Sequence, residues 1–150
     1  MWKEKSVGGL IIVAALALSG CSGGRSPLNL GVTEGRLAPC PDSPNCVSSQ
    51  AAHENQQIEA LRYTGDTTQA RNRLLTVLNR MERVQIRQAD ADYLHAEFSS
   101  AWLGFVDDVE FHFNPPGVIQ ARSASRTGYY DFGVNRERVN AIRAQFDALR

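Results

Sequence analysis

The sequence lacks a net charge, a long hydrophobic run and, after residue 5, any lysine. Both lysines and Glu4 precede residue 21, which leaves 14 arginines against 15 acidic residues in the remainder. Without a basic excess we expect no nucleic-acid partner, because clustered positive charge is what holds phosphates. The apolar run Val7–Leu18 ends after 12 residues, well short of the roughly 20 that a bilayer-spanning helix needs.

Signatures of catalysis are also missing. The chain has no Gly-x-Ser-x-Gly elbow, and its three histidines among many serines define no unique nucleophile and base. About 130 residues remain after position 20, enough for one domain with one core. The composition therefore predicts a single globular domain and does not indicate an enzymatic reaction.

A targeting signal, by contrast, is present at the start. A weakly basic beginning, the apolar run and the small residues of Leu18-Ser19-Gly20 precede Cys21, as in a secretory signal that ends in a lipobox. At such a site the cysteine is diacylated and the preceding peptide is removed. We expect residues 1–20 to be a signal peptide and Cys21 to be lipidated. A short uncleaved membrane helix is the alternative.

Lipidation would attach the protein to a membrane through Cys21. Each buried methylene contributes about 0.8 kcal/mol, so two or more acyl chains hold firmly. Ser22 follows the cysteine, where the sorting rule of bacterial lipoproteins places Asp for retention at the inner membrane. We therefore expect a protein that faces the periplasm, with the outer membrane favoured.

The segment 21–38 is rich in glycine and poor in large apolar side chains, which predicts a flexible tether. At about 3.3 Å per residue, some 18 extended residues would span about 60 Å. The folded domain is expected over residues 39–150.

Two cysteines remain once Cys21 is lipidated. Cys40 and Cys46 flank a proline-rich turn, and an even pair in an exported protein is most simply a disulfide. A metal site that adds a histidine such as His53 is the alternative, but two thiols without a second paired motif are a weak ligand set. The spacing also differs from the Cys-x-x-Cys of redox enzymes. We predict a disulfide, no metal and no cofactor.

Hydrophobic periodicity predicts an α+β domain in the order β-α-β-β-β-β-α. The strands are expected at 57–63, 84–88, 93–99, 105–113 and 118–125, and the helices at 67–82 and from Asn135 to the C-terminal end. Phenylalanines alternate with polar residues over 105–113, so one sheet face should be apolar and the other solvated. The prediction is an antiparallel sheet of about five strands with two helices on one face.

Side-chain parity selects the register of the last hairpin. A three-residue loop over 115–117 pairs Glu110 with Arg122, whereas a four-residue loop would set Arg122 against Val109. We expect the three-residue register, with Asp108, Glu110 and Arg122 as a solvated ion-pair ladder. His95, on the preceding strand, is expected to be half exposed.

Hydrogen-bonding side chains gather between the last strand and the last helix. Arginines, hydroxyls, glycines and a helix N-terminus in this segment could hold an anion such as a phosphate or a carboxylate. The alternative is structural, with Asp131 paired to Arg126 or Arg136 and Asn135 as the helix cap. The candidate ligand-binding residues are Asp107, Asp108, Arg122, Ser123, Ser125, Arg126, Asp131, Asn135 and Arg136.

Two adjacent carboxylates are the candidates for chemistry. Asp107 lies on the core side of its strand near Ser125, so it needs a partner such as Ser125 or Arg126. A carboxylate of this kind can be catalytic through a shifted pKa or simply structural. Asp108 and Glu110 could hold a cation or form a carboxylate pair, although ion pairing across the sheet would suffice.

Trp102 and Leu103 form an apolar tip between two predicted strands. This tip could touch lipid or a protein partner, or it could fold onto the core.

Three sequence blocks together resemble a known family. The blocks are Cys40-Pro41-Asp42-Ser43-Pro44-Asn45-Cys46-Val47-Ser48-Ser49, then Phe105-Val106-Asp107-Asp108-Val109-Glu110-Phe111 preceded by Tyr93-Leu94-His95-Ala96, and the segment 122–136. They are similar to the domain of unknown function 1499 family over roughly residues 38–149. Members occur in bacteria, sometimes as lipoproteins. The family has no established reaction, so the resemblance implies a domain boundary but no mechanism.

These observations favour an envelope lipoprotein that is not an enzyme and whose domain binds a small ligand, a lipid or an envelope protein. A hydrolase or transferase that uses Asp107 or Asp108 as acid or base is one alternative, and it requires both carboxylates to converge in a pocket. A structural component of an envelope assembly is the other, and it requires an exposed apolar patch around Trp102 and Leu103.

Overall fold

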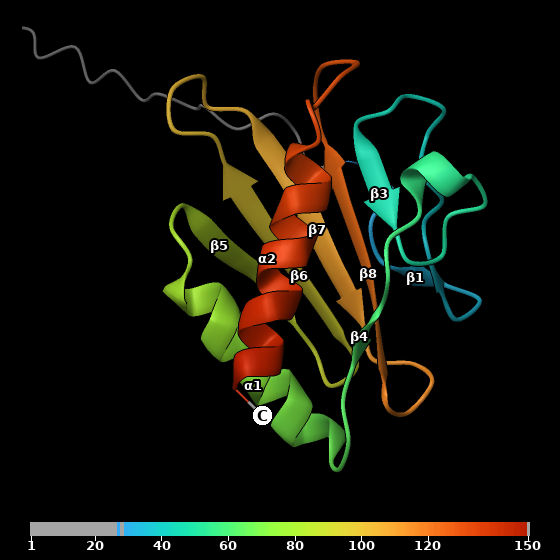
Figure 1. Ribbon diagram of the computed structural model, residues 1–150, viewed down its shortest axis with the longest axis vertical. Coiled ribbons are helices and arrows are strands. Elements are labelled where there is room, and N and C mark those ends of the chain that lie inside the picture. Colours follow the sequence, from blue (N-terminus) through green and yellow to red (C-terminus); the bar gives the residue numbers. More distant parts are fainter. Residues whose placement is uncertain (1–26, 28, 150) are drawn as a thin grey trace, which may run out of the picture.

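A six-stranded sheet carries two helices on one of its faces (Figure 1). Its strands are β3 (Cys46–Ser48), β4 (Leu61–Arg62), β5 (Val84–Ala89), β6 (Tyr93–Ser99), β7 (Val106–His112) and β8 (Val118–Ser125). They lie in the order β3-β8-β7-β6-β5, with β4 also beside β8, and all pair antiparallel. The helices are α1 (Thr67–Arg80) and α2 (Val134–Ala148), and η1 (Glu54–Gln56) is a short 3-10 turn. The predicted α+β class is confirmed.

The computed structural model describes residue 27 and residues 29–149. The expected signal peptide, Cys21 and the first part of the expected tether lie outside these residues. None of the described helices has both the length and the apolar character needed to cross a membrane.

The hairpin β7–β8 has the predicted register, with Glu110 opposite Arg122. Its loop closes through a hydrogen bond from the Val118 N–H to the Pro115 carbonyl at 3.0 Å. Gly117 in this loop has a φ of 84°, and a Cβ there would lie 3.4 Å from the Tyr63 carbonyl. The positive φ is therefore what favours glycine at this turn, while a Cβ would be in contact with the Tyr63 carbonyl.

The core lies between the sheet and the helices. Asp66 starts α1 by accepting a hydrogen bond from the Gln69 N–H at 3.0 Å, which is a typical N-cap. The helices bury apolar side chains at helical spacing, as predicted, against alternate residues of the strands. The buried residues include Ala70, Leu74, Val77 and Leu78 of α1, Val139, Ile142 and Phe146 of α2, and Leu94, Ala96, Val109, Phe111, Ile119 and Ala121 of the sheet.

The strand predicted at 57–63 is wrong over most of its length, because only Leu61–Arg62 form β4. The edge of β8 explains this difference. β3 occupies its C-terminal half, with Ser48 opposite Arg122, so β4 finds partners only near Ile119. The expected core position of Phe105 is also wrong, since this residue precedes β7 and is exposed.

Folded structure extends into the segment expected as a tether. β1 (Val32–Thr33) and β2 (Arg36–Leu37) form a small hairpin, and Leu37 is buried. The Leu37 N–H donates to Gln50 Oε1 at 2.9 Å and the Gly31 N–H donates to Glu110 Oε1 at 2.7 Å. Backbone amides make these contacts, and contacts of this kind produce no hydrophobic periodicity in the sequence. Residues 29–38 are therefore part of the fold.

The predicted disulfide between Cys40 and Cys46 is confirmed, with 5.6 Å between its Cα atoms. It links the N-terminal segment to β3. Both thiols are used, which excludes the alternative of a thiolate metal site.

Candidate functional site

The sheet separates the candidate residues of β7 and β8 onto its two faces. Asp107, Ser123 and Ser125 point toward the helices, whereas Asp108 and Arg122 point to the opposite face, as strand alternation requires. Asp107 and Asp108 therefore do not converge. The arrangement that an acid–base pair of these two carboxylates requires is not formed.

The face opposite the helices carries a cluster of buried charges, which we call the ionic cluster. It comprises His95 and Glu97 of β6, Asp108 and Glu110 of β7, and Arg122 and Arg126 at and beyond β8. Asp108 is at its centre. One of its oxygens faces His95 Nε2 at 2.8 Å, and Arg126 donates from Nε and Nη2 to both of its oxygens at 2.8 Å each. Arg126 also pairs with Glu97, which binds Arg87 on its other oxygen.

Asp108 and Glu97 of the ionic cluster are held in their charged form. Burial by itself raises the pKa of Asp108, but hydrogen bonds from Arg126 and His95 outweigh it and keep that pKa below its ordinary value. The same balance, with Arg87 and Arg126 as donors, lowers the pKa of Glu97. The pKa of Arg126 is raised, chiefly by its hydrogen bonds to Asp108. Asp108 is thus suited to accept hydrogen bonds and not to donate a proton as a general acid.

Glu110 forms the second half of the ionic cluster. It is completely buried and accepts from Arg122 Nη1 at 2.8 Å, from the Tyr93 hydroxyl at 2.7 Å and from the Gly31 N–H. Burial, followed by the charge of Glu110, raises the pKa of Tyr93. The predictions of a solvated ladder and of a half-exposed His95 are wrong, because the segment before β3 packs on this face.

A small cavity of about 190 Å³ lies over the ionic cluster, between Pro27, Asn29 and Pro41 on one side and β7 and β8 on the other. Arg122 lines it, and the Nε of this buried arginine has no hydrogen-bond partner among the described residues. A space of this size can hold ordered water, to which Arg122 Nε could donate.

The polar groups at the start of α2 bind one another. Asn135 is completely buried, and its amide contacts Ser123, Ser125 and Arg138. Asp131 caps the helix by accepting from the Gly133 N–H at 3.0 Å and the Asn135 N–H at 2.9 Å. These N–H donors outweigh burial and lower the pKa of Asp131.

The predicted cap at Asn135 is therefore wrong, since Asp131 is the capping residue and Asn135 lies in the first helical turn. Asp131 also accepts its hydrogen bonds from Gly133 and Asn135 and not from Arg126 or Arg136, so the predicted pairing is wrong. Arg136 instead donates to the carbonyls of Gln57 and Asn55 at 2.6 and 2.7 Å and fixes the turn η1 to the helix.

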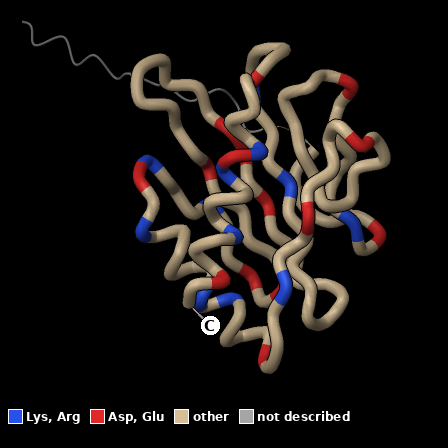
Figure 2. The backbone as a smooth tube through the Cα atoms, in the orientation of Figure 1, with Lys and Arg blue, Asp and Glu red and all other residues tan. Residues whose placement is uncertain are grey.

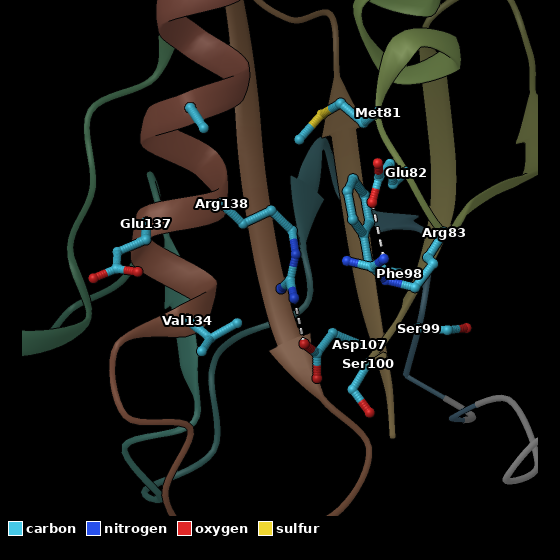
Figure 3. A pocket seen from close by; sticks show the side chains of 11 residues that line it. Met81, Glu82, Arg83, Phe98, Ser99, Ser100, Asp107, Val134, Glu137 and Arg138 are labelled. Atoms are coloured by element: carbon cyan, nitrogen blue, oxygen red, sulfur yellow. Dashed lines mark hydrogen bonds and ion pairs between the residues drawn. The ribbon is translucent and has the colours of Figure 1, made fainter. Parts of the chain in front are cut away.

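A larger cleft of about 470 Å³ opens on the helix side of the sheet, and we call it the Asp107 cleft (Figure 3). It is lined by Met81, Glu82, Arg83, Phe98, Ser99, Ser100, Asp107, Val134, Glu137, Arg138 and Ala141. Arg138 Nη2 donates to Asp107 Oδ2 at 2.6 Å, and its guanidinium lies 4.9 Å from the centre of the Phe98 ring. Asp107 is thus paired with Arg138 and not with Ser125 or Arg126 as predicted.

The Asp107 cleft combines apolar side chains with buried charge. Met81, Phe98, Val134 and Ala141 supply the apolar surface, while the Asp107–Arg138 pair is largely buried beside them. All the described hydrogen bonding of Asp107 goes to Oδ2, and its second oxygen points away from Arg138 (Figure 3). The cleft therefore offers one carboxylate oxygen as an acceptor together with apolar side chains.

Arg138 is the main cleft residue that the sequence prediction missed. A signal was available, because Arg138 precedes the buried Ile142 by four residues and follows the buried Asn135 by three. At that spacing all three lie on the helix face that packs against the sheet.

No curated protein matches the chain. The family model described as "Protein of unknown function (DUF1499)" matches residues 36–146, a range that contains the disulfide, the ionic cluster and every lining residue of the Asp107 cleft. The resemblance drawn from the three sequence blocks is thereby confirmed, and the chain belongs to the DUF1499 family.

Proposed function

We propose that this protein is a lipoprotein of the bacterial envelope, held in the membrane by acyl chains on Cys21, whose domain binds a small amphiphilic ligand in the Asp107 cleft. The signal-like residues before Cys21 support the export and lipidation. The disulfide agrees with an oxidising compartment.

The cleft carries the binding part of the proposal. Ligand sites are usually concave, mostly apolar and of about 300–1,000 Å³, with a few polar groups that fix orientation. The Asp107 cleft has this volume and this mixture of surfaces. An apolar group of the ligand would pack on Met81 and Phe98, and a hydroxyl or amine would donate to Asp107.

A binding function agrees better with the geometry than catalysis does. Asp107 forms an ion pair with Arg138, and Asp108 faces the other side of the sheet. A structural role in an envelope assembly is the second candidate, because Trp102 and Leu103 are strongly exposed, as that function requires.

Two alanines of α2 provide a matched test. Ala141 lines the cleft, whereas Ala144 is exposed on the same helix outside it. Native mass spectrometry of the full chain, extracted from membranes in mild detergent, should show a bound small molecule in the wild type. Ala141→Trp should lose that mass because the indole fills the cleft, and Ala144→Trp should keep it.

Either of two results would contradict this function. A small molecule that stays bound in Ala141→Trp, or a wild type that carries none, argues against a ligand in the cleft. The same spectra report the anchor separately, since an intact chain with residues 1–20 and no acyl chains would overturn the lipoprotein assignment.

A further inference from the structure

Exposed apolar side chains are concentrated at one end of the described molecule. Of the nine large hydrophobic residues that are exposed, six lie in two loops. Trp102, Leu103 and Phe105 are in the β6–β7 loop, and Tyr129, Tyr130 and Phe132 are in the β8–α2 loop. We call these six residues the aromatic end. Trp102 and Phe132 are 94% and 93% exposed.

The strand pairing brings the two loops together. β6 ends at Ser99 opposite Val106, and β8 ends at Ser125 opposite Asp107, so both loops leave the same end of the sheet. Figure 1 shows both loops at the upper end of the molecule.

Hydrogen bonds hold the base of the β6–β7 loop, whose tip is uncharged, whereas residues 129–132 of the β8–α2 loop include one carboxylate, Asp131. In the β6–β7 loop the Ser100 N–H donates to the Phe105 carbonyl at 2.8 Å and the Phe105 N–H donates to Ser100 Oγ at 3.0 Å. Residues 100–105 include no charge, and the loop is uniformly tan in Figure 2. In the β8–α2 loop the rings of Tyr129 and Tyr130 pack edge to face, with 5.2 Å between their centres, and the carboxylate of Asp131 caps the helix.

We propose that the aromatic end is a membrane-docking surface, whose side chains enter the interfacial region of the bilayer that holds Cys21. This inference rests on the lipid anchor of the proposed function. Trp and Tyr favour that region because each combines a large apolar ring with a polar group that stays hydrated. The exposed apolar side chains of the two loops, with the Asp131 carboxylate held at the start of α2, favour contact with a lipid surface.

The path of the chain supports a bilayer as the occupant. Pro27 and Asn29 line the small cavity together with Ser125 and Arg126, at the end of β8 from which the aromatic loop departs. Eight residues lead from Cys21 to Asn29, and they span at most about 28 Å at about 3.5 Å each. The proposed lipid on Cys21 would therefore lie within about 28 Å of Asn29, which leaves the aromatic end within its reach.

Docking in this orientation would also place the Asp107 cleft at the membrane. Ser100 belongs to the β6–β7 loop, and Val134 follows the β8–α2 loop, and both line the cleft. The cleft thus begins at the base of the two loops, where a ligand taken from the lipid phase would enter.

The fluorescence of Trp102 reports directly on the surroundings of the aromatic end. The sequence has two tryptophans, and Trp2→Phe leaves Trp102 alone whether or not residues 1–20 are removed. We would reconstitute the full Trp2→Phe chain in phosphatidylethanolamine–phosphatidylglycerol vesicles with and without brominated acyl chains. The expected result is a blue-shifted Trp102 emission that brominated lipid quenches strongly.

A matched pair of variants tests the surface. Leu103→Glu combined with Phe132→Glu should abolish most of the quenching and return the emission toward that of water-exposed tryptophan. Val32 of β1 and Leu149 at the C-terminal end of α2 are exposed apolar residues outside the two loops, so Val32→Glu combined with Leu149→Glu should leave the quenching unchanged. Circular dichroism of each variant checks that the fold is retained.

The outcomes separate the two proposals. A chain that floats with the vesicles but whose Trp102 is not quenched overturns the docking surface and leaves the anchor intact. An unlipidated chain that is still quenched overturns the anchor and supports the surface, and one that is neither lipidated nor quenched overturns both. A blue shift that grows with protein density but resists brominated lipid would assign the surface to a second copy of the chain and overturn docking.

Discussion

Glu110 lies completely buried, and its charge is balanced locally by Arg122. Moving a charged group out of water is costly, so such a pair persists only when further donors satisfy the carboxylate. The Tyr93 hydroxyl and the Gly31 N–H supply these donors. The stability of this site therefore depends on keeping every member of a small group together.

Replacing Arg122 by methionine should lower the free energy of unfolding by about 3–5 kcal/mol, because Glu110 would remain buried without its countercharge. Chemical denaturation of the detergent-solubilised chain measures this. Arg83→Met is the control, since Arg83 pairs with Glu82 on the surface, where an ion pair contributes at most about 1 kcal/mol. Equal effects of the two substitutions would show that the Glu110–Arg122 pair is not critical.

At the scale of secondary-structure elements, α2 depends on a residue that precedes it. Its N-cap position is Gly133, which has no side chain to accept a hydrogen bond. Asp131 supplies the acceptor from two residues earlier and also contacts the Asn135 side chain. The helix start, the end of β8 and the loop after Cys40 are joined through this buried asparagine.

Asp131→Ala should destabilise the protein by about 1–2 kcal/mol, since it removes the cap of α2 and one partner of a buried amide. Thermal unfolding followed by circular dichroism would measure the change. Glu137→Ala removes an exposed carboxylate in the same first turn, which is worth only a few tenths of a kcal/mol through the helix dipole. The cap assignment fails if Glu137→Ala is the more harmful of the two.

The elements that enclose the apolar core between the sheet and the helices could be predicted from the sequence. β6, β8, α1 and the hairpin register follow from side-chain periodicity, because that face must be apolar. β3 and β4 could not be separated in the same way. They divide one edge of β8 between them, and a two-residue strand has no period to detect.

The candidate site was predictable only in part, for a related reason. Periodicity marks a polar strand face as solvated, so His95, Asp108 and Glu110 gave no sign of burial. The segment that covers them binds through backbone groups such as the Gly31 N–H and through the disulfide, neither of which produces an apolar pattern. The division of Asp107 from Asp108, by contrast, follows directly from strand alternation.

At the scale of the whole molecule, stability and proposed binding occupy different places. One sheet face packs on helices and the other on the N-terminal segment through the ionic cluster. The Asp107 cleft and the aromatic end lie where strands meet loops. Substitutions in the ionic cluster should therefore change stability first, while those in the loops should change membrane contact first.

Acidification should destabilise the protein through the ionic cluster. The pKa values of Asp108 and Glu97 are lower in the folded chain than their ordinary values near 4. Both groups therefore contribute stability that is fully present above about pH 4 and is lost as the pH falls through their folded pKa values. The melting temperature should fall steeply below about pH 4.

Asp108→Asn should be less stable than the wild type at neutral pH, but its melting temperature should fall less steeply with acid, because one of the linked protons is no longer taken up. A variant whose acid transition has the same slope as that of the wild type would exclude Asp108 as a source of the pH dependence.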